Sequence, residues 1–85
     1  MAKKPVIVGS SVGLHARPAA TVAAAAGEYD DEITLSLAGG DPIDASSVLL
    51  IMTLGAEHGS EITVESDNAE AVDKIAALIE KDLDA

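Results

Sequence analysis

The stretch "EITVESDNAEAVDKIAALIEKDL", residues 61–83, changes its hydrophobic period halfway along. Its first residues alternate apolar with polar, with Ile62 and Val64 on the same side, which is typical of a strand with one buried face. Asp67 and Glu70 then stand at capping-box spacing and predict the start of a helix. The apolar residues that follow recur at helical intervals: Val72, Ile75, Ala76, Ile79 and Leu83. The stretch therefore predicts a strand followed directly by an amphipathic helix.

The N-terminal part of the chain also predicts a strand and then a helix. β-Branched residues over Lys4–Val8 favour a strand that stops at Gly9. After a polar loop, Pro18 stands where a first helical turn tolerates its missing N–H, and an alanine-rich run with strong helix propensity follows. We therefore expect a helix over Ala16–Ala26, ended by Gly27.

The middle of the chain is less uniform. Alternation over Ile33–Leu37 predicts a strand, and a short extended piece is expected around Ile43. The segment Ala45–Leu54 contains the apolar block "VLLIMTL", which periodicity alone does not assign. Ser46 or Ser47 in front of this block is suited to cap a short helix, because its hydroxyl can accept from unpaired N–H groups.

The predicted order is strand, helix, strand, strand, helix, strand, helix, in one domain over residues 1–85. This order favours an α+β domain whose helices cover one face of an antiparallel sheet. A chain of 85 residues cannot enclose a deep cavity, so any chemistry is expected at the surface. The core must use Val, Ile, Leu and Ala, because Phe and Trp are absent.

Composition excludes several classes of function. A formal charge of −10 argues against binding to nucleic acid and to anionic membranes, and favours protein or small-molecule partners. The absence of cysteine excludes disulfides and thiolate metal sites. The apolar run "VIV" near the N-terminus is too short for a signal peptide or a membrane span, so we expect a cytoplasmic protein.

The stretch "VGLHARPAAT", residues 12–21, carries the strongest indication of chemistry. It places His15 at the boundary between a loop and the predicted helix, where unpaired N–H groups and the helix dipole favour an anion. Arg17 adds a guanidinium whose donors fit phosphate oxygens, and a neutral imidazole is a nucleophile. These residues indicate a phosphoryl acceptor, although a solvated histidine or a helix cap would give the same pattern.

At these residues the chain resembles the HPr family, the histidine phosphocarriers of the bacterial phosphoenolpyruvate-dependent sugar phosphotransferase system. "GLHARPA", residues 13–19, is similar to the family's phosphohistidine signature, and "SSVLLIMTLGAEHGSEITV", residues 46–64, is similar to its serine-site helix and last strand. The resemblance implies an open-faced β-sandwich with four antiparallel strands and three helices on one face.

The resemblance also implies a function. His15 would accept a phosphoryl group on Nδ1 from phosphorylated enzyme I and pass it to enzyme IIA proteins for sugar uptake. Arg17 would stabilise the phosphoryl group. The protein would be a carrier rather than a stand-alone enzyme, without metal or cofactor, and nothing demands more than a monomer.

Val48, Leu49 and Met52 align with an exposed docking surface of the family, although core packing is an equally good interpretation for each. Ser47 aligns with a serine that a dedicated kinase phosphorylates in some members, and a transcriptional regulator is a further conceivable partner. His58 has no matching role and is expected to be a solvated loop residue.

Several positions depart from the family pattern. They are Val12, Ser46, Leu50 and the turn "AGGDP" at residues 38–42, which is one residue longer than usual. The departures at Ser46, Leu50 and the turn favour a plain helix cap over kinase regulation at the serine site. Two other functions remain open: an HPr-like adaptor in a regulatory or nitrogen-related branch, and a small domain that binds free phosphate.

Overall fold

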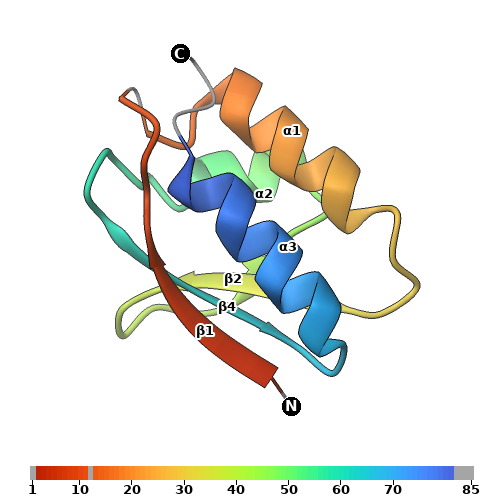
Figure 1. The fold of residues 1–85 in the computed structure, drawn as a ribbon. Helices are drawn as coiled ribbons and strands as arrows, with labels where there is room; N and C mark the ends of the chain where they lie inside the picture. The colour runs from red at the N-terminus through yellow and green to blue at the C-terminus, as the bar shows by residue number, and fades with distance from the viewer. Residues whose placement is uncertain (1, 12, 82–85) are drawn as a thin grey trace.

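A four-stranded antiparallel sheet in the order β1-β4-β2-β3 forms one layer of the computed structural model, which describes residues 2–11 and 13–81 (Figure 1). Its strands are β1 (Ala2–Ile7), β2 (Ile33–Leu37), β3 (Ile43–Asp44) and β4 (Glu61–Ser66). β4 pairs with both β1 and β2, so the last strand in the chain lies inside the sheet.

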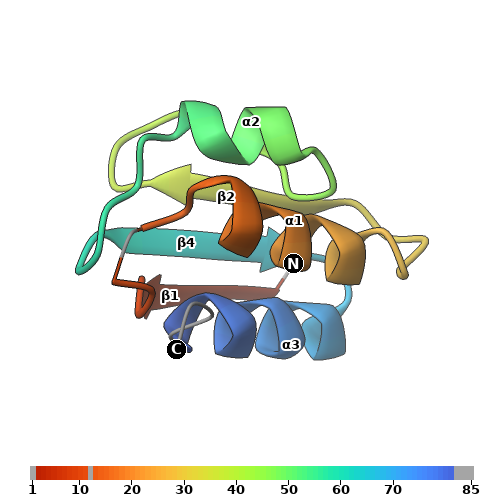
Figure 2. The same cartoon turned by 90° about the horizontal axis from the view of Figure 1, so that it is seen from above.

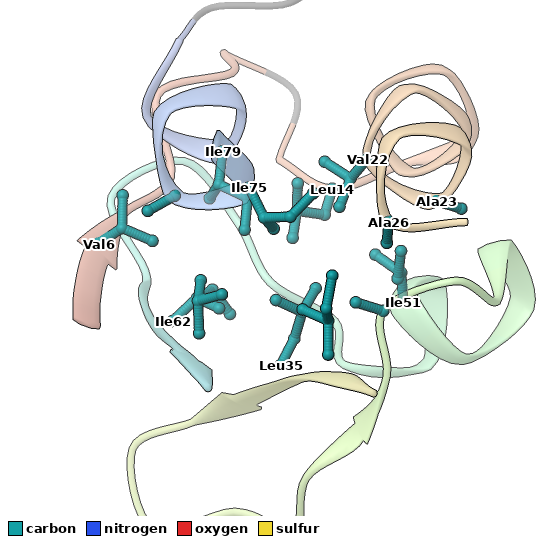
Figure 3. Close-up of a cluster of buried hydrophobic side chains, with 14 of the residues drawn as sticks. Val6, Leu14, Val22, Ala23, Ala26, Leu35, Ile51, Ile62, Ile75 and Ile79 are labelled. Carbon is teal, nitrogen blue, oxygen red and sulfur yellow. The ribbon is translucent and has the colours of Figure 1, made fainter. Parts of the chain in front are cut away.

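Three helices form the second layer, on one face of the sheet (Figures 2 and 3). They are α1 (Ala16–Ala26), α2 (Val48–Thr53) and α3 (Ala69–Glu80). The predicted α+β class, with four antiparallel strands and three helices on one face, is confirmed. None of the helices within the described ranges has the length and apolar character needed to cross a membrane.

The core lies between the two layers and follows the periods seen in the sequence (Figure 3). On the sheet side, Leu35, Ile62 and Val64 are fully buried because alternate residues of a strand face the same side. The buried alanines and Val22 of α1 belong to the same core cluster, and this helix packs against both α2 and α3. The predicted core residues of α3 that lie within the described ranges are buried: Val72, Ile75, Ala76 and Ile79.

Two boundaries differ from the sequence prediction. β1 begins at Ala2 because it pairs with Ser66 at the end of β4, and it ends at Ile7 rather than Val8. The cap of α3 is Asn68, whose side-chain oxygen accepts from the Ala71 N–H at 3.2 Å, so the predicted capping box starting at Asp67 is wrong by one residue. Of the residues discussed above, Val12 and Leu83 lie outside the described ranges.

Asn68 also connects two distant segments. Its side-chain Nδ2 donates to Asp31 Oδ2 at 3.0 Å, and its backbone N–H donates to Ser66 Oγ at 3.2 Å. One side chain thus stabilises the start of α3 and holds the loop between α1 and β2 against it.

We expect Asn68→Ala to lower the free energy of unfolding by about 1 kcal/mol, because the helix loses its N-cap. Urea denaturation at pH 7 measures this loss. Asp67→Ala is the matched control, and its effect should stay within about 0.5 kcal/mol, as for other exposed positions. A larger loss for Asp67→Ala than for Asn68→Ala would show that Asp67 is the cap after all.

Candidate functional site

His15 occupies the N-cap position of α1. Its backbone is extended, with φ −80° and ψ −170°, and its carbonyl oxygen accepts from the Ala19 N–H at 2.8 Å. The side chain is exposed and makes no capping hydrogen bond to the helix. The imidazole is therefore held at the start of a helix by its backbone alone, which leaves both ring nitrogens open to a ligand or a partner.

The first turn of α1 offers backbone donors next to this imidazole. Within the described ranges, the N–H groups of Ala16 and Arg17 have no hydrogen-bond partner. Pro18, the third residue of the helix, has no N–H and is buried, so it starts the helix without adding an unpaired donor to the core. Two free N–H groups and the positive end of the helix dipole meet at His15.

Arg17 adds a full positive charge to the same turn. Its side chain is exposed, and in the described part of the chain the one ion pair joins Lys4 to Asp73, at 3.9 Å. The first turn of α1 holds no acidic residue. In a chain with 15 acidic and five basic residues, this turn is a local exception that suits an anion.

The segment before His15 is anchored by backbone contacts. The Leu14 N–H donates to the Ala56 carbonyl at 3.0 Å, and the Gly13 N–H donates to the Ser10 carbonyl at 3.0 Å. Gly13 has φ +74°, and a Cβ at this position would overlap the carbonyl oxygen of Ala56. The glycine is needed both for the turn and for the close approach of the second backbone.

The segment that follows α2 provides the other side of this contact. The Val8 N–H donates to the Ser60 carbonyl at 2.9 Å, and the Gly59 N–H donates to the Val8 carbonyl at 3.0 Å. Within the turn itself, Ser60 Oγ accepts from the Glu57 N–H at 3.0 Å. The loop that carries His15 therefore rests on a turn that is closed by its own hydrogen bonds. His58 lies in this turn with its side chain exposed, as expected.

The two serines before α2 have different partners. Ser47 is the N-cap, because its Oγ accepts from the Leu50 N–H at 3.2 Å, which confirms one of the two predicted caps. Ser46 instead donates from its hydroxyl and its N–H to Asp44 Oδ1, at 2.7 and 2.9 Å. The bond from the Ser46 hydroxyl, and to a smaller extent the bond from its N–H, lowers the pKa of the Asp44 carboxyl below its ordinary value.

The surface of α2 is apolar on its outer side. Ile51 is the buried residue of this helix. Each further residue along an α-helix is rotated by about 100° about the axis, so the residues next to Ile51 point away from the core. Leu49 is 77% exposed, Met52 41% and Leu50 40%, whereas Val48 is partly buried against the core. We call Leu49, Leu50 and Met52 the α2 patch. Of the two interpretations that the sequence left open, exposure holds for Leu49 and Met52, and packing against the core holds in part for Val48.

Leu50 belongs to the patch although the sequence indicated no role for it. No sequence signal would have found it, because a continuous apolar block does not indicate that Ile51 is the residue that faces the core. When Ile51 faces the core, its two neighbours in α2, Leu50 and Met52, both lie at the edge of the buried side of the helix, where they are partly exposed.

The patch and the histidine lie at neighbouring parts of the surface. α1 and α2 pack against each other, and the Leu14–Ala56 hydrogen bond joins the start of α1 to the segment just after α2. Figure 2 shows the last turn of α2 beside the first turn of α1. Residues 2–11 and 13–81 hold no group of three or more His, Cys, Asp or Glu side chains suited to a metal ion.

The fold and the site together define a small α+β protein that presents an exposed histidine, backbone donors and an arginine at a helix start, beside an apolar helix. The family model described as the PTS HPr component phosphorylation site matches residues 2–81. The chain belongs to this family, the HPr phosphocarriers of the phosphotransferase system, and the resemblance found in the sequence is confirmed. Membership implies partners within that system.

Individual relatives agree over nearly the whole length. Phosphocarrier protein HPr of Streptomyces coelicolor is 40% identical over an alignment of 87 positions, which covers 99% of this chain and 94% of that protein. The crystal structure of HPr from Bacillus anthracis has a TM-score of 0.85 at 32% identity, covering 92% of this chain and 95% of that one. HPr-C-His from Thermoanaerobacter tengcongensis has a TM-score of 0.89 at 26% identity, covering 100% and 98%.

We expect Gly13→Ala to lower the free energy of unfolding by about 1–3 kcal/mol and to shift the amide resonances of His15, Ala16 and Arg17, because the added Cβ pushes the loop off Ala56. Gly39→Ala is the matched control. Gly39 has φ +75°, but a Cβ there would meet no atom within 4 Å. Urea denaturation and amide NMR spectra of both variants measure the difference. Equal destabilisation, with the site resonances unmoved, would contradict the anchoring role of Gly13.

Proposed function

We propose that His15 accepts a phosphoryl group on Nδ1 from phosphorylated enzyme I and transfers it to enzyme IIA proteins, with residues 1–85 acting as one domain in the cytoplasm. The observation that carries the proposal is the position of His15 at the N-cap of α1. There its side chain makes no capping bond, and within the described ranges the next two residues, Ala16 and Arg17, have free N–H groups and Arg17 has no ion pair.

The transfer step uses the imidazole as a nucleophile. With the ring proton on Nε2, the Nδ1 lone pair attacks phosphorus, an N–P bond forms, and the bond from phosphorus to the donor atom breaks with its electron pair. Passing the group to enzyme IIA reverses these roles, with Nδ1 as the leaving atom. The exposed position of His15 suits this exchange, because each partner must bring its own reacting atom into line with phosphorus.

Charge stabilisation at this site comes from donors that are already in place. The N–H groups of Ala16 and Arg17 and the Arg17 guanidinium can donate to phosphoryl oxygens without reorganisation of the helix. The acidic residues after α1, among them Asp30 and Asp31, stand at the other end of a helix of 11 residues. That length is about 16 Å, so salt at physiological strength screens most of their repulsion.

The α2 patch is the proposed docking surface for both partners. Its three members are apolar and exposed, and Arg17 is the nearest basic residue along α1, whose remaining positions carry no Lys or Arg. The other basic residues of the sequence are Lys3, Lys4, Lys74 and Lys81, on or next to β1 and α3. We therefore propose that docking depends more on apolar contact than on positive charge.

Ser47 is first a helix cap, and its phosphorylation as a regulatory position is a secondary proposal. Its hydroxyl already accepts from the Leu50 N–H as the helix cap. A phosphoryl group placed there by a serine kinase would add about −1.5 to −2 charges directly before the α2 patch and would weaken docking of an acidic partner. A transcriptional regulator that reads this state would be a further partner.

The carrier function is tested by incubating the protein with phosphoenolpyruvate, magnesium and enzyme I, followed by intact-mass analysis. We expect an acid-labile gain of about 80 Da that His15→Ala abolishes and His58→Ala retains. Addition of enzyme IIA should then remove the label.

The remaining outcomes separate the alternatives. Binding of inorganic phosphate without any covalent label, while the same enzyme I labels another carrier, would indicate a phosphate-binding domain and contradict the proposal. Labelling that only a nitrogen-branch acceptor discharges would place the chain in that parallel branch.

Arg17→Ala should slow onward transfer roughly tenfold or more, because a charge-assisted donor to the phosphoryl group is lost. Its unfolding midpoint should stay close to that of the original protein, since the side chain is exposed and has no ion pair in the described ranges. Time-resolved phosphoryl-transfer assays measure the rate, and thermal denaturation measures the unfolding midpoint. Parallel losses in both would show that Arg17 supports the fold rather than the phosphoryl group.

A further inference from the structure

Met52 combines accessibility with a position in the proposed docking surface. Its side chain is 41% exposed on the last turn of α2. The sequence contains no cysteine and two methionines, so Met52 is its one sulfur atom beyond the first residue. We propose that Met52 is a redox modification site, and that its oxidation to methionine sulfoxide by hydrogen peroxide weakens partner docking. This proposal rests on the function proposed above.

The reaction is a two-electron oxygen transfer. The thioether sulfur lone pair attacks one peroxide oxygen, the O–O bond breaks, and the products are the sulfoxide and water. Sulfur is oxidised and peroxide is reduced, with no other reactant. Thiols, which would compete for peroxide within the same protein, are absent from this chain.

The hydrogen bonds that hold α2 do not use the Met52 side chain. Ile51 is the fully buried residue of α2, and the helix is held by the Ser47 cap at its start. At its end, the backbone N–H groups of Leu54 and Gly55 donate to the carbonyls of Ile51 and Met52, at 3.1 and 3.2 Å. None of these bonds involves sulfur, so the sulfoxide can form in water without displacing a packed side chain.

Docking responds differently, because the patch is apolar. Leu49 precedes Met52 by three residues, so their exposed side chains are neighbours on the surface of α2, and a partner that covers Leu49 also removes Met52 from water. A thioether is compatible with such a contact, whereas a sulfoxide carries a strong acceptor oxygen that would be buried without a donor. A buried unpaired polar group lowers affinity by an amount that corresponds to roughly a tenfold rise in Kd.

The test uses the full-length protein with and without prior peroxide treatment, after removal of peroxide with catalase. Intact mass should show a gain of about 16 Da for each oxidised methionine, and peptide mapping should find one of these oxygens on Met52 and distinguish it from any on Met1. Phosphoryl acceptance from phosphorylated enzyme I is then measured over a range of carrier concentrations. We expect the apparent Kd to rise roughly tenfold, the maximal rate to change little, and a methionine sulfoxide reductase to restore the original value.

Two sets of variants sharpen the result. Met52→Leu, compared with its own untreated sample, should be insensitive to peroxide, and Met52→Gln should show raised Kd without peroxide. Leu49→Asp tests the patch itself, and Ile7→Asp is its matched control. Ile7 is 50% exposed on β1, and it faces away from the helices because Val6 beside it is buried.

The outcomes are distinguishable from failure of the carrier function. If the untreated protein accepts no phosphoryl group, the function proposed above fails. If it does accept one, three results each overturn the role of Met52: an unchanged Kd after oxidation, a Leu49→Asp variant no weaker than Ile7→Asp, or a large fall in melting temperature on oxidation. Retained melting temperature with a reversible rise in Kd supports it.

Discussion

The backbone contact between the loop before His15 and the turn after α2 is the constraint on which the site depends. The imidazole makes no capping bond of its own, so its place is set by where the chain enters α1. That entry is set by the Leu14–Ala56 hydrogen bond and by a glycine that lets the two backbones meet. This contact joins the start of α1 to the segment just after α2, and the direct packing of α1 against α2 keeps both on one side of the molecule.

The same constraint explains how a strongly acidic chain can carry an anion. Backbone N–H groups at the start of a helix can donate hydrogen bonds to an anion, so fewer lysines are needed to bind it. Arg17 supplies one charge, and acidic residues are absent from that turn. The lysines lie on β1, on α3 and next to them, where Lys4 and Asp73 form an exposed ion pair. Exposed pairs of this kind contribute little to stability.

The fold was largely predictable because the spacing of apolar residues follows the period of a strand or of a helix in most elements. Ile62 and Val64 alternate in β4, and the apolar residues of α3 recur at helical intervals, so each element could be assigned from local pattern. The cap of α3 was misplaced because Asp67 and Asn68 are both good N-cap residues and adjacent. The choice between them follows from the bonds of Asn68 to Ser66 and Asp31. The bond to Asp31 joins residues 37 positions apart, which no local pattern contains.

The sequence by itself determined which residues are candidates for the chemistry: a histidine, an arginine and a proline at a helix start predict an anion site wherever that helix lies, because free N–H groups are a property of the helix end. Only the tertiary structure decided what surrounds it. Whether Val48, Leu49, Leu50 or Met52 would be buried depended on which side of α2 met the core, and that was decided when Ile51 packed inward. A continuous apolar block carries no period from which that direction can be read.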